Sequence, residues 1–184
     1  VYLLHWLYRR SSKEVSFVRT GMLGEKVVIS GGAFVLPIIH NITQVGMRTL
    51  SLNIKRAGEK SLITKDRMRA ELVTEFFTKV PPEAKAVSTA AQTLGNRTLD
   101  PEHLKEVVAG RFADALGEVA AKMTLDEIQE NRGHFVKEVA KIANESIGHT
   151  GLALETVSII SLDQAPIEMF NPANTFDSQG LTQL

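Results

Sequence analysis

The residue types that most often carry catalysis or hold metals are few in this chain and far apart. No two histidines have the four-residue helical spacing of a zinc-binding H-E-x-x-H motif, and the chain has no cysteine. Isolated histidines of this kind are structural or solvated side chains more often than ligands. They are His5, His40, His103, His134 and His149. We therefore predict no metal site and no cofactor.

The glycines and carboxylates also lack the spacing that phosphate binding or covalent catalysis requires. The glycines near Gly21 and Gly31 form neither a G-x-G-x-x-G fingerprint nor a P-loop, and turns between strands account for them. There is no G-x-S-x-G nucleophile elbow. Asp126 and Glu127 lie near a predicted helix start, where capping and the helix dipole favour acidic residues. The sequence therefore predicts no enzymatic activity.

The balance of charge argues against a nucleic-acid partner. The 184 residues include 21 Lys and Arg and 21 Asp and Glu, so the formal net charge is zero. A nucleic-acid binder normally shows a basic excess or stripe. A hydrophobic content of 43% is ordinary for a globular domain. Near-neutrality suits a protein that self-associates, because little colloidal repulsion keeps copies apart.

An apolar, aromatic segment opens the chain and is followed at once by two arginines. The run "VYLLHWLY" is too short to span a bilayer, which takes about 20 apolar residues. Aromatic rings beside cations are typical of the interfacial end of a membrane-spanning helix, and the arginines place the following domain on the cytoplasmic face. An amphipathic segment packed on its own domain is the alternative. The membrane-contact residues predicted here are Leu4, Trp6, Leu7, Tyr8, Arg9 and Arg10.

From residue 14 to residue 80 the pattern has the period of two that is typical of strands. Gly31 and Gly32 can supply the positive φ of a tight hairpin turn, and Pro37 limits the strand that follows. A turn at 65–67 joins two further strands. In the second of these, one predicted face consists of Met68, Ala70, Leu72, Thr74 and Phe76, and the other of Arg69, Glu71, Glu75 and Lys79.

After Pro82 the period changes to that of helices. Alanine-rich residues 82–94 end at a glycine, and residues 101–123 carry one apolar stripe. Thr124 and Glu127 form a capping box before the next helical segments, and residues 152–162 read as a closing strand. We predict an α+β fold: an antiparallel-rich sheet of about five to seven strands, then about three to four helices and a closing strand.

Three segments, in this order, resemble the SPFH or Band 7 domain shared by stomatins, prohibitins and flotillins. They are "FVRTGMLGEKVVISGGAFVLPIIHNITQVGMRTLSLNI", "LITKDRMRAELVTEFF" and "MTLDEIQENRGHFVKEVAKIANESIGHTGLALETVSIISLD". The third is most similar to flotillins. Arg67 departs from the family, in which glycine or asparagine often follows the K-D of the second segment.

The resemblance implies a domain organisation. Residues 1–13 would be the end of a transmembrane helix and its basic flank, and residues 14–165 the SPFH domain. That domain would divide into a membrane-proximal strand sub-domain, 14–55, and a mixed sub-domain, 56–165. Residues 166–184 would be a connector to a coiled coil.

The resemblance also implies the function of a bacterial flotillin-like inner-membrane protein. Such a protein is a scaffold of many copies that forms rings or cages and organises a membrane microdomain. Its partners would be lipid, other copies of itself and a membrane-protein client. The alternative is a regulatory module that encloses or restrains a membrane enzyme such as a protease.

Two surfaces follow from this reading. The first sub-domain would dip into the bilayer through Phe34, Val35, Leu36, Ile38 and Ile39, and a buried strand end is the alternative for these residues. Subunits in a closed ring must meet head to tail. Charged rows that could meet in this way, or could simply be solvated, are Arg69, Glu71, Glu75, Lys105, Glu106, Arg111 and Glu118.

Overall fold

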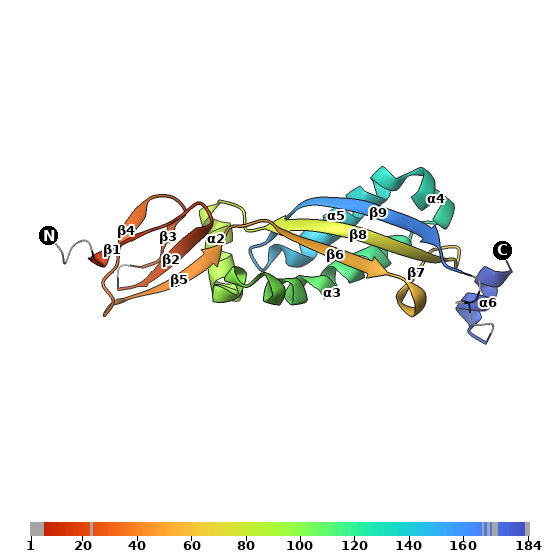
Figure 1. The fold of residues 1–184 in the computed structure, drawn as a ribbon, viewed down its shortest axis with the longest axis horizontal. Coiled ribbons are helices and arrows are strands. Elements are labelled where there is room, and N and C mark those ends of the chain that lie inside the picture. Colours follow the sequence, from red (N-terminus) through yellow and green to blue (C-terminus); the bar gives the residue numbers. More distant parts are fainter. Residues whose placement is uncertain (1–5, 23, 167, 169, 171–172, 183–184) are drawn as a thin grey trace. The chain divides into compact units, whose positions relative to one another are not determined.

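The chain folds into two compact units, drawn together in Figure 1. The computed structural model describes residues 6–22, 24–166, 168, 170 and 173–182. Unit 1 comprises Val1–Leu50, Thr78–Val107 and Ile147–Ala153, and unit 2 comprises Ser51–Phe77, Val108–Ser146 and Leu154–Leu184. Strands come first, helices next and one long strand after them, so the predicted α+β class is confirmed.

Unit 1 contains two small antiparallel sheets. One pairs β1 (Tyr8–Arg10) with β4 (Gly32–Phe34), and the other has the order β3-β2-β5, formed by Lys26–Val28, Val15–Gly21 and His40–Gly46. The interior side chains of these strands are apolar. Phe17, Val28 and Ala33 form a buried cluster, and Ile42 packs against it. Burial of this cluster stabilises the two sheets, because apolar area leaves water.

The predicted hairpin at Gly31 and Gly32 is wrong. β3 pairs with β2 and β4 pairs with β1, so the two strands that flank these glycines belong to different sheets. Gly31 does adopt a positive φ of 85°. The glycine pair thus redirects the chain from one sheet to the other, which local turn chemistry alone does not distinguish from a hairpin.

Helix α2 (Ala84–Thr93) and the 3-10 helix η2 (Gly95–Leu99) complete unit 1. The Gly46 N–H donates to the Thr98 hydroxyl oxygen at 2.9 Å. A Cβ at Gly46 would lie 2.3 Å from the Thr98 carbonyl oxygen, so the close approach of β5 and η2 requires glycine there.

Unit 2 is built on a four-stranded sheet whose central strand is β8 (Arg69–Lys79). The other strands are β6 (Leu50–Arg56), β7 (Leu62–Ile63), which follows the 3-10 helix η1 (Gly58–Lys60), and β9 (Ala153–Gln164). Along β8 every second side chain is buried, among them Ala70, Leu72 and Phe76, as the predicted period of two requires.

Helices cover one face of this sheet in Figure 1. They are α3 (Pro101–Ala120), α4 (Leu125–Glu130) and α5 (Arg132–Gly148). The rings of Phe76 and Phe112 stack between β8 and α3, with centroids 4.4 Å apart and planes at 9°. The capping box of Thr124 and Glu127 is present, so the predicted start of α4 is confirmed.

The turn between β7 and β8 holds Arg67 in the left-handed backbone conformation that glycine and asparagine adopt most easily. Arg67 has a φ of 64°. Among the described residues it is the one non-glycine residue with a positive φ. The turn is closed by bonds from Thr64 N to Met68 O at 2.9 Å and from Arg67 N to Thr64 O at 3.0 Å. Arg67 therefore accepts a conformation that L-residues rarely adopt.

The segment expected to be a connector contains a helix, α6 (Thr175–Leu181), that is tied to the start of β8. Arg69 donates from Nε to Asp177 Oδ1 at 2.6 Å and from Nη2 to Oδ2 at 3.0 Å. The Asp177 side chain is only 3% exposed. A two-pronged bond of this kind fixes both distance and orientation, so this part of the segment packs on unit 2.

Candidate functional site

Unit 1 exposes five large apolar side chains just before β1, on β1, on β4 and in the loop that leads to β5. We call them together the apolar surface: Trp6, Tyr8, Phe34, Leu36 and Ile38, with exposed fractions of 70%, 40%, 56%, 43% and 97%. A single exposed apolar residue is unremarkable, whereas a cluster of large ones marks an interaction surface.

The strand pair β1–β4 positions the aromatic part of the apolar surface. Tyr8 lies opposite Phe34 in the register, and their rings meet edge to face with centroids 5.3 Å apart. The Tyr8 ring covers Gly32, where a Cβ would lie 2.6 Å from Tyr8 Cζ and from the Arg9 carbonyl oxygen. Glycine at position 32 therefore allows this pairing.

Hydrogen bonds hold the loop between β4 and β5 in a compact turn. His40 N donates to the Leu36 carbonyl oxygen at 2.9 Å, and Leu36 N donates to His40 Nδ1 at 3.1 Å. Arg19 Nη1 donates to the carbonyl oxygen of Phe34 at 2.8 Å. These bonds satisfy polar backbone groups of the turn, so the turn can keep a defined conformation while Ile38 is exposed to solvent.

The predicted membrane-contact residues separate by exposure. Besides the five residues of the apolar surface, Arg9 and Arg10 are exposed, and Leu7 and Ile39 are half-buried. Val35 is only 5% exposed and faces the interior, so it does not belong to this surface. Leu4 lies outside the described residues.

Tyr8, which was expected at the interfacial end of a transmembrane helix, is not helical. Tyr8–Arg10 form strand β1, which is paired with β4. Among the residues that the structure describes, none lies in a helix long and apolar enough to cross a membrane.

Two residues of unit 1 have a degree of burial that the sequence did not indicate. Met22 is 79% exposed directly after β2, and a methionine beside glycines gave no periodic signal. His40, expected to be an ordinary structural histidine, is 8% exposed, and its Nε2 has no hydrogen-bond partner among the described residues. Only the tertiary structure could reveal that burial.

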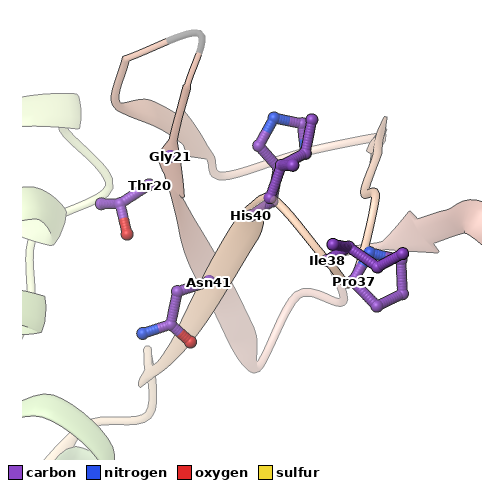
Figure 2. Close-up of a pocket in the computed structure, with 7 residues that line it drawn as sticks. Thr20, Gly21, Pro37, Ile38, His40 and Asn41 are labelled. Carbon is purple, nitrogen blue, oxygen red and sulfur yellow. The ribbon is translucent and has the colours of Figure 1, made fainter.

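Two cavities adjoin His40. The larger, about 410 Å³, is lined by Thr20, Gly21, Pro37, Ile38, Ile39, His40 and Asn41. Figure 2 shows Thr20 and Asn41 side by side on neighbouring strands, while the His40 ring points away from both. The smaller, about 190 Å³, is lined by Trp6, Arg9, Val35, Pro37, His40 and Ile42. We call the smaller one the Arg9–His40 cavity.

Three of the residues predicted to form a subunit interface are hydrogen-bonded within their own chain. Arg69 is bonded to Asp177 and its side chain is 12% exposed, so its guanidinium binds within its own chain rather than facing a neighbouring subunit. Glu71 Oε1 accepts from Gly58 N at 2.9 Å, and Arg111 Nη1 donates to the Ser146 carbonyl oxygen at 2.6 Å.

The other members of that set lie on the surface of the structure. Lys105 pairs with Glu102 at 3.1 Å and Glu118 with Lys122 at 2.7 Å, each within α3 or just past its end. Glu106 is exposed and Glu75 half-buried. Exposed pairs of this kind contribute little to stability, so little stability would be lost if these side chains bonded to a neighbouring subunit instead.

Comparison with known proteins shows to which family this chain is similar. Residues 11–174 match the family model described as "SPFH domain / Band 7 family". Flotillin family inner membrane protein YqiK of Escherichia coli is 51% identical over 178 residues, which are 97% of this chain and 32% of that protein.

More distant relatives carry similar names. A flotillin family inner membrane protein of Synechocystis is 28% identical over 98% of this chain and 27% of its own length. Human flotillin-1 is 25% identical over 83% of this chain and 36% of its own length. The chain thus spans about a third of the curated relatives it matches.

Proposed function

This chain belongs to the SPFH domain / Band 7 family, and from that premise we propose that it is a membrane-attached scaffold domain that carries no chemistry of its own. It assembles in many copies into rings or cages and organises a membrane microdomain. The bacterial relatives are named inner membrane proteins, which supports the same membrane for this chain, with the domain on the cytoplasmic face.

The observation that carries the proposal is the apolar surface beside two exposed arginines. Transfer of a large apolar side chain out of water stabilises by about 1.5–3 kcal/mol, so three of them supply several kcal/mol for each copy. Arg9 and Arg10 follow Tyr8 directly and are exposed. Cations next to aromatic side chains suit the headgroup layer of a bilayer.

Assembly into a ring would strengthen a membrane attachment that is weak for a single copy. Once one copy of a ring is on the bilayer, the others bind in an effectively intramolecular step, so the avidity exceeds the affinity of one copy. The exposed charges of Lys105, Glu106 and Glu118, together with Glu75, are the candidates for head-to-tail contacts. Arg69 is left out of this set because of its bond to Asp177.

The membrane contact can be tested with the single tryptophan of the chain, Trp6. We expect its emission to shift to shorter wavelength on vesicles and to be quenched by lipids with brominated acyl chains. We expect Ile38→Asp to weaken vesicle partitioning at least about tenfold, since a charge would replace an apolar group that the bilayer would bury.

A matched control is the same change at an exposed isoleucine of unit 2. Ile160 lies on β9 and is 57% exposed, so Ile160→Asp leaves the apolar surface intact. Equal partitioning of Ile38→Asp, Ile160→Asp and the unchanged chain would contradict the membrane contact.

The assembly can be tested on the complete protein extracted in mild detergent. Electron microscopy should show closed rings or cages of one diameter. Dispersed single copies across concentration and lipid would contradict the scaffold. A membrane protein that co-purifies in fixed stoichiometry would identify the client.

A further inference from the structure

Charge is divided unevenly between the two units. Unit 1 carries ten Lys and Arg and six Asp and Glu, whereas unit 2 carries 11 and 15. The formal net charges of the units are therefore +4 and −4, and the zero net charge of the whole chain conceals this difference. The surplus of unit 1 comes from residues 1–50, which contain six Lys and Arg and two Asp and Glu. Unit 1 therefore attracts anions and unit 2 repels them.

Four cations of residues 1–50 are connected with the apolar surface through the strands. Arg9 and Arg10 are exposed on β1, which also carries one residue of the apolar surface. Arg19 of β2 donates from Nη1 to the carbonyl oxygen of Phe34 at 2.8 Å. Lys26 of β3 is exposed and lies opposite Arg19 in the register. We call these four residues the cationic group: Arg9, Arg10, Arg19 and Lys26.

Within the cationic group, Arg19 and Lys26 bring like charges together. They are direct partners in the antiparallel register of β2 and β3, so both side chains leave the sheet on the same face. On the other side of β2 the partner of Arg19 is Ile42, which carries no charge. Like charges placed directly opposite each other destabilise a sheet. The pair therefore brings no stability to the sheet, and an anionic partner would relieve its repulsion.

The two carboxylates of residues 1–50 are bonded to other side chains. Glu14 pairs with Arg48. Glu25 accepts hydrogen bonds from Ser88 Oγ and from Gln92 Nε2. In the part of the chain that the structure describes, no member of the cationic group forms an ion pair. The positive charge of the group is therefore not neutralised by a carboxylate partner within these residues.

The neighbours of the cationic group indicate which anionic partner fits. Phe34, Leu36 and Ile38 are 56%, 43% and 97% exposed. A nucleic acid would offer charge to the cations but little apolar surface to these three side chains. A bilayer that contains anionic lipid offers both, because its acyl layer lies directly beneath a layer of negative headgroups.

We propose that the cationic group makes membrane attachment depend on anionic lipid. The attraction acts between the group and the charged surface of the bilayer as a whole and needs no closed pocket. Because unit 2 is negative, the same surface repels it, so charge also selects unit 1 as the part that meets the bilayer. This inference rests on the proposed membrane attachment and deepens it by naming the class of lipid.

The test measures partitioning of the 184-residue chain to two kinds of sedimented vesicle: phosphatidylcholine alone, and an equal mixture of phosphatidylcholine and phosphatidylglycerol. Lys26→Gln and Arg10→Gln each remove one charge of the cationic group, from different sheets. The matched control is Lys137→Gln, because Lys137 is an exposed lysine of α5 in unit 2. Ile38→Ser removes apolar area without changing the charge. Far-UV circular dichroism checks the fold of each variant.

On the mixed vesicles we expect Lys26→Gln and Arg10→Gln each to weaken partitioning about fivefold, the effect of one cation near an anionic surface. Lys137→Gln should change it by less than about twofold, since charges beyond a Debye length from the surface are screened. On phosphatidylcholine alone these three variants should bind as the unchanged chain does. Ile38→Ser should weaken partitioning to both kinds of vesicle.

Salt and stability give two further measurements. Raising the salt from about 0.1 M to about 1 M shortens the Debye length from about 10 Å to about 3 Å, so we expect the preference for mixed vesicles to disappear. Lys26→Gln should not lower the urea midpoint of unfolding, because it removes the repulsion with Arg19. A loss of binding without a loss of stability separates contact with lipid from a structural role.

Each contrary result has a distinct meaning. Equal, salt-independent partitioning of the unchanged chain to both vesicles would overturn the dependence on anionic lipid while the membrane attachment stands. Losses for Lys137→Gln as large as those for Lys26→Gln and Arg10→Gln would overturn the role of the cationic group. Tighter binding of a DNA duplex than of the mixed vesicles would overturn lipid as the partner. If the unchanged chain binds neither vesicle, both this inference and the proposed attachment are overturned.

Discussion

Strand β8 in unit 2 alternates between outward and inward side chains, whereas the segment Phe34–Ile39 in unit 1 has one buried residue, Val35, among exposed and half-buried ones. In β8 the inward side chains are Ala70, Leu72 and Phe76 together with two threonines, and the outward ones include the charged Glu71 and Glu75. In Phe34–Ile39 the inward Val35 is apolar, and so are the outward Phe34, Leu36 and Ile38.

The difference lies in the chemistry of the outward side. Charged side chains on one side of β8 leave a single stable way to orient the strand, because the other orientation would bury those charges. Phe34–Ile39 contains no charged side chain that would fix its orientation in this way. An uncharged stretch exposes apolar area whichever way it is turned, and the exposed area is then available to a partner of similar polarity.

The largest expected contrast comes from one substitution made in both regions. Phe112→Ala removes a fully buried ring that stacks on Phe76, so we expect the free energy of unfolding to fall by about 4 kcal/mol. Phe34 is 56% exposed, so Phe34→Ala should lower it by less than about 1 kcal/mol. Urea unfolding followed by circular dichroism measures both.

Similar losses at the two phenylalanines would break the comparison. They would mean that Phe34 packs in solution as a core residue does, and the apolar surface would then not be available to a membrane.

The next contrast concerns charge. Asp177→Ala leaves the Arg69 guanidinium buried without its partner, so we expect a loss of about 3 kcal/mol in the free energy of unfolding. Glu118→Ala removes one member of an exposed pair with Lys122, and we expect a change below about 0.5 kcal/mol.

Protease susceptibility gives a second measurement of the same pair of variants. Asp177→Ala should expose the segment that contains α6 to cleavage, whereas Glu118→Ala should not. An Asp177→Ala variant as stable and as resistant as the unchanged chain would show that the bond does not hold α6.

The smallest contrast uses two glycines. Gly32→Ala places a methyl group against the Tyr8 ring and the Arg9 backbone, so we expect a loss of about 2 kcal/mol in the free energy of unfolding. Gly110 lies inside α3 with no atom near its missing Cβ, so Gly110→Ala should stabilise by about 0.5–1 kcal/mol.

The two glycine variants are also expected to differ in membrane binding. Gly32→Ala should weaken vesicle partitioning because it disturbs the Tyr8–Phe34 pair, whereas Gly110→Ala should leave it unchanged. Unaltered stability of Gly32→Ala would indicate that β1 is not held against β4.

Much of unit 2 could be predicted from the sequence because its signals are local. The alternation in β8, the capping box at Thr124 and Glu127, and the apolar stripe of α3 each depend on residues a few positions apart. The family resemblance rested on two segments of this kind together with one from unit 1, and the match over residues 11–174 confirms it.

Unit 1 was harder to predict because its decisive contacts are not local. β1 pairs with β4 across more than twenty residues, and a strand of three residues carries almost no periodic signal. The same reason explains why Tyr8 was expected at the end of a helix and why Gly31 and Gly32 were expected to close a hairpin.

The sequence by itself determined the α+β class, the family, the succession of strands, helices and a closing strand, and which side of β8 is buried, because each depends on periodicity or on residues close in the chain. The tertiary structure decided which side of Phe34–Ile39 faces solvent, that Arg69 is bonded to Asp177, and that His40 keeps a buried donor without a partner. These properties arise where distant segments meet, and the burial of a side chain there is set by its spatial neighbours rather than by its neighbours in the chain.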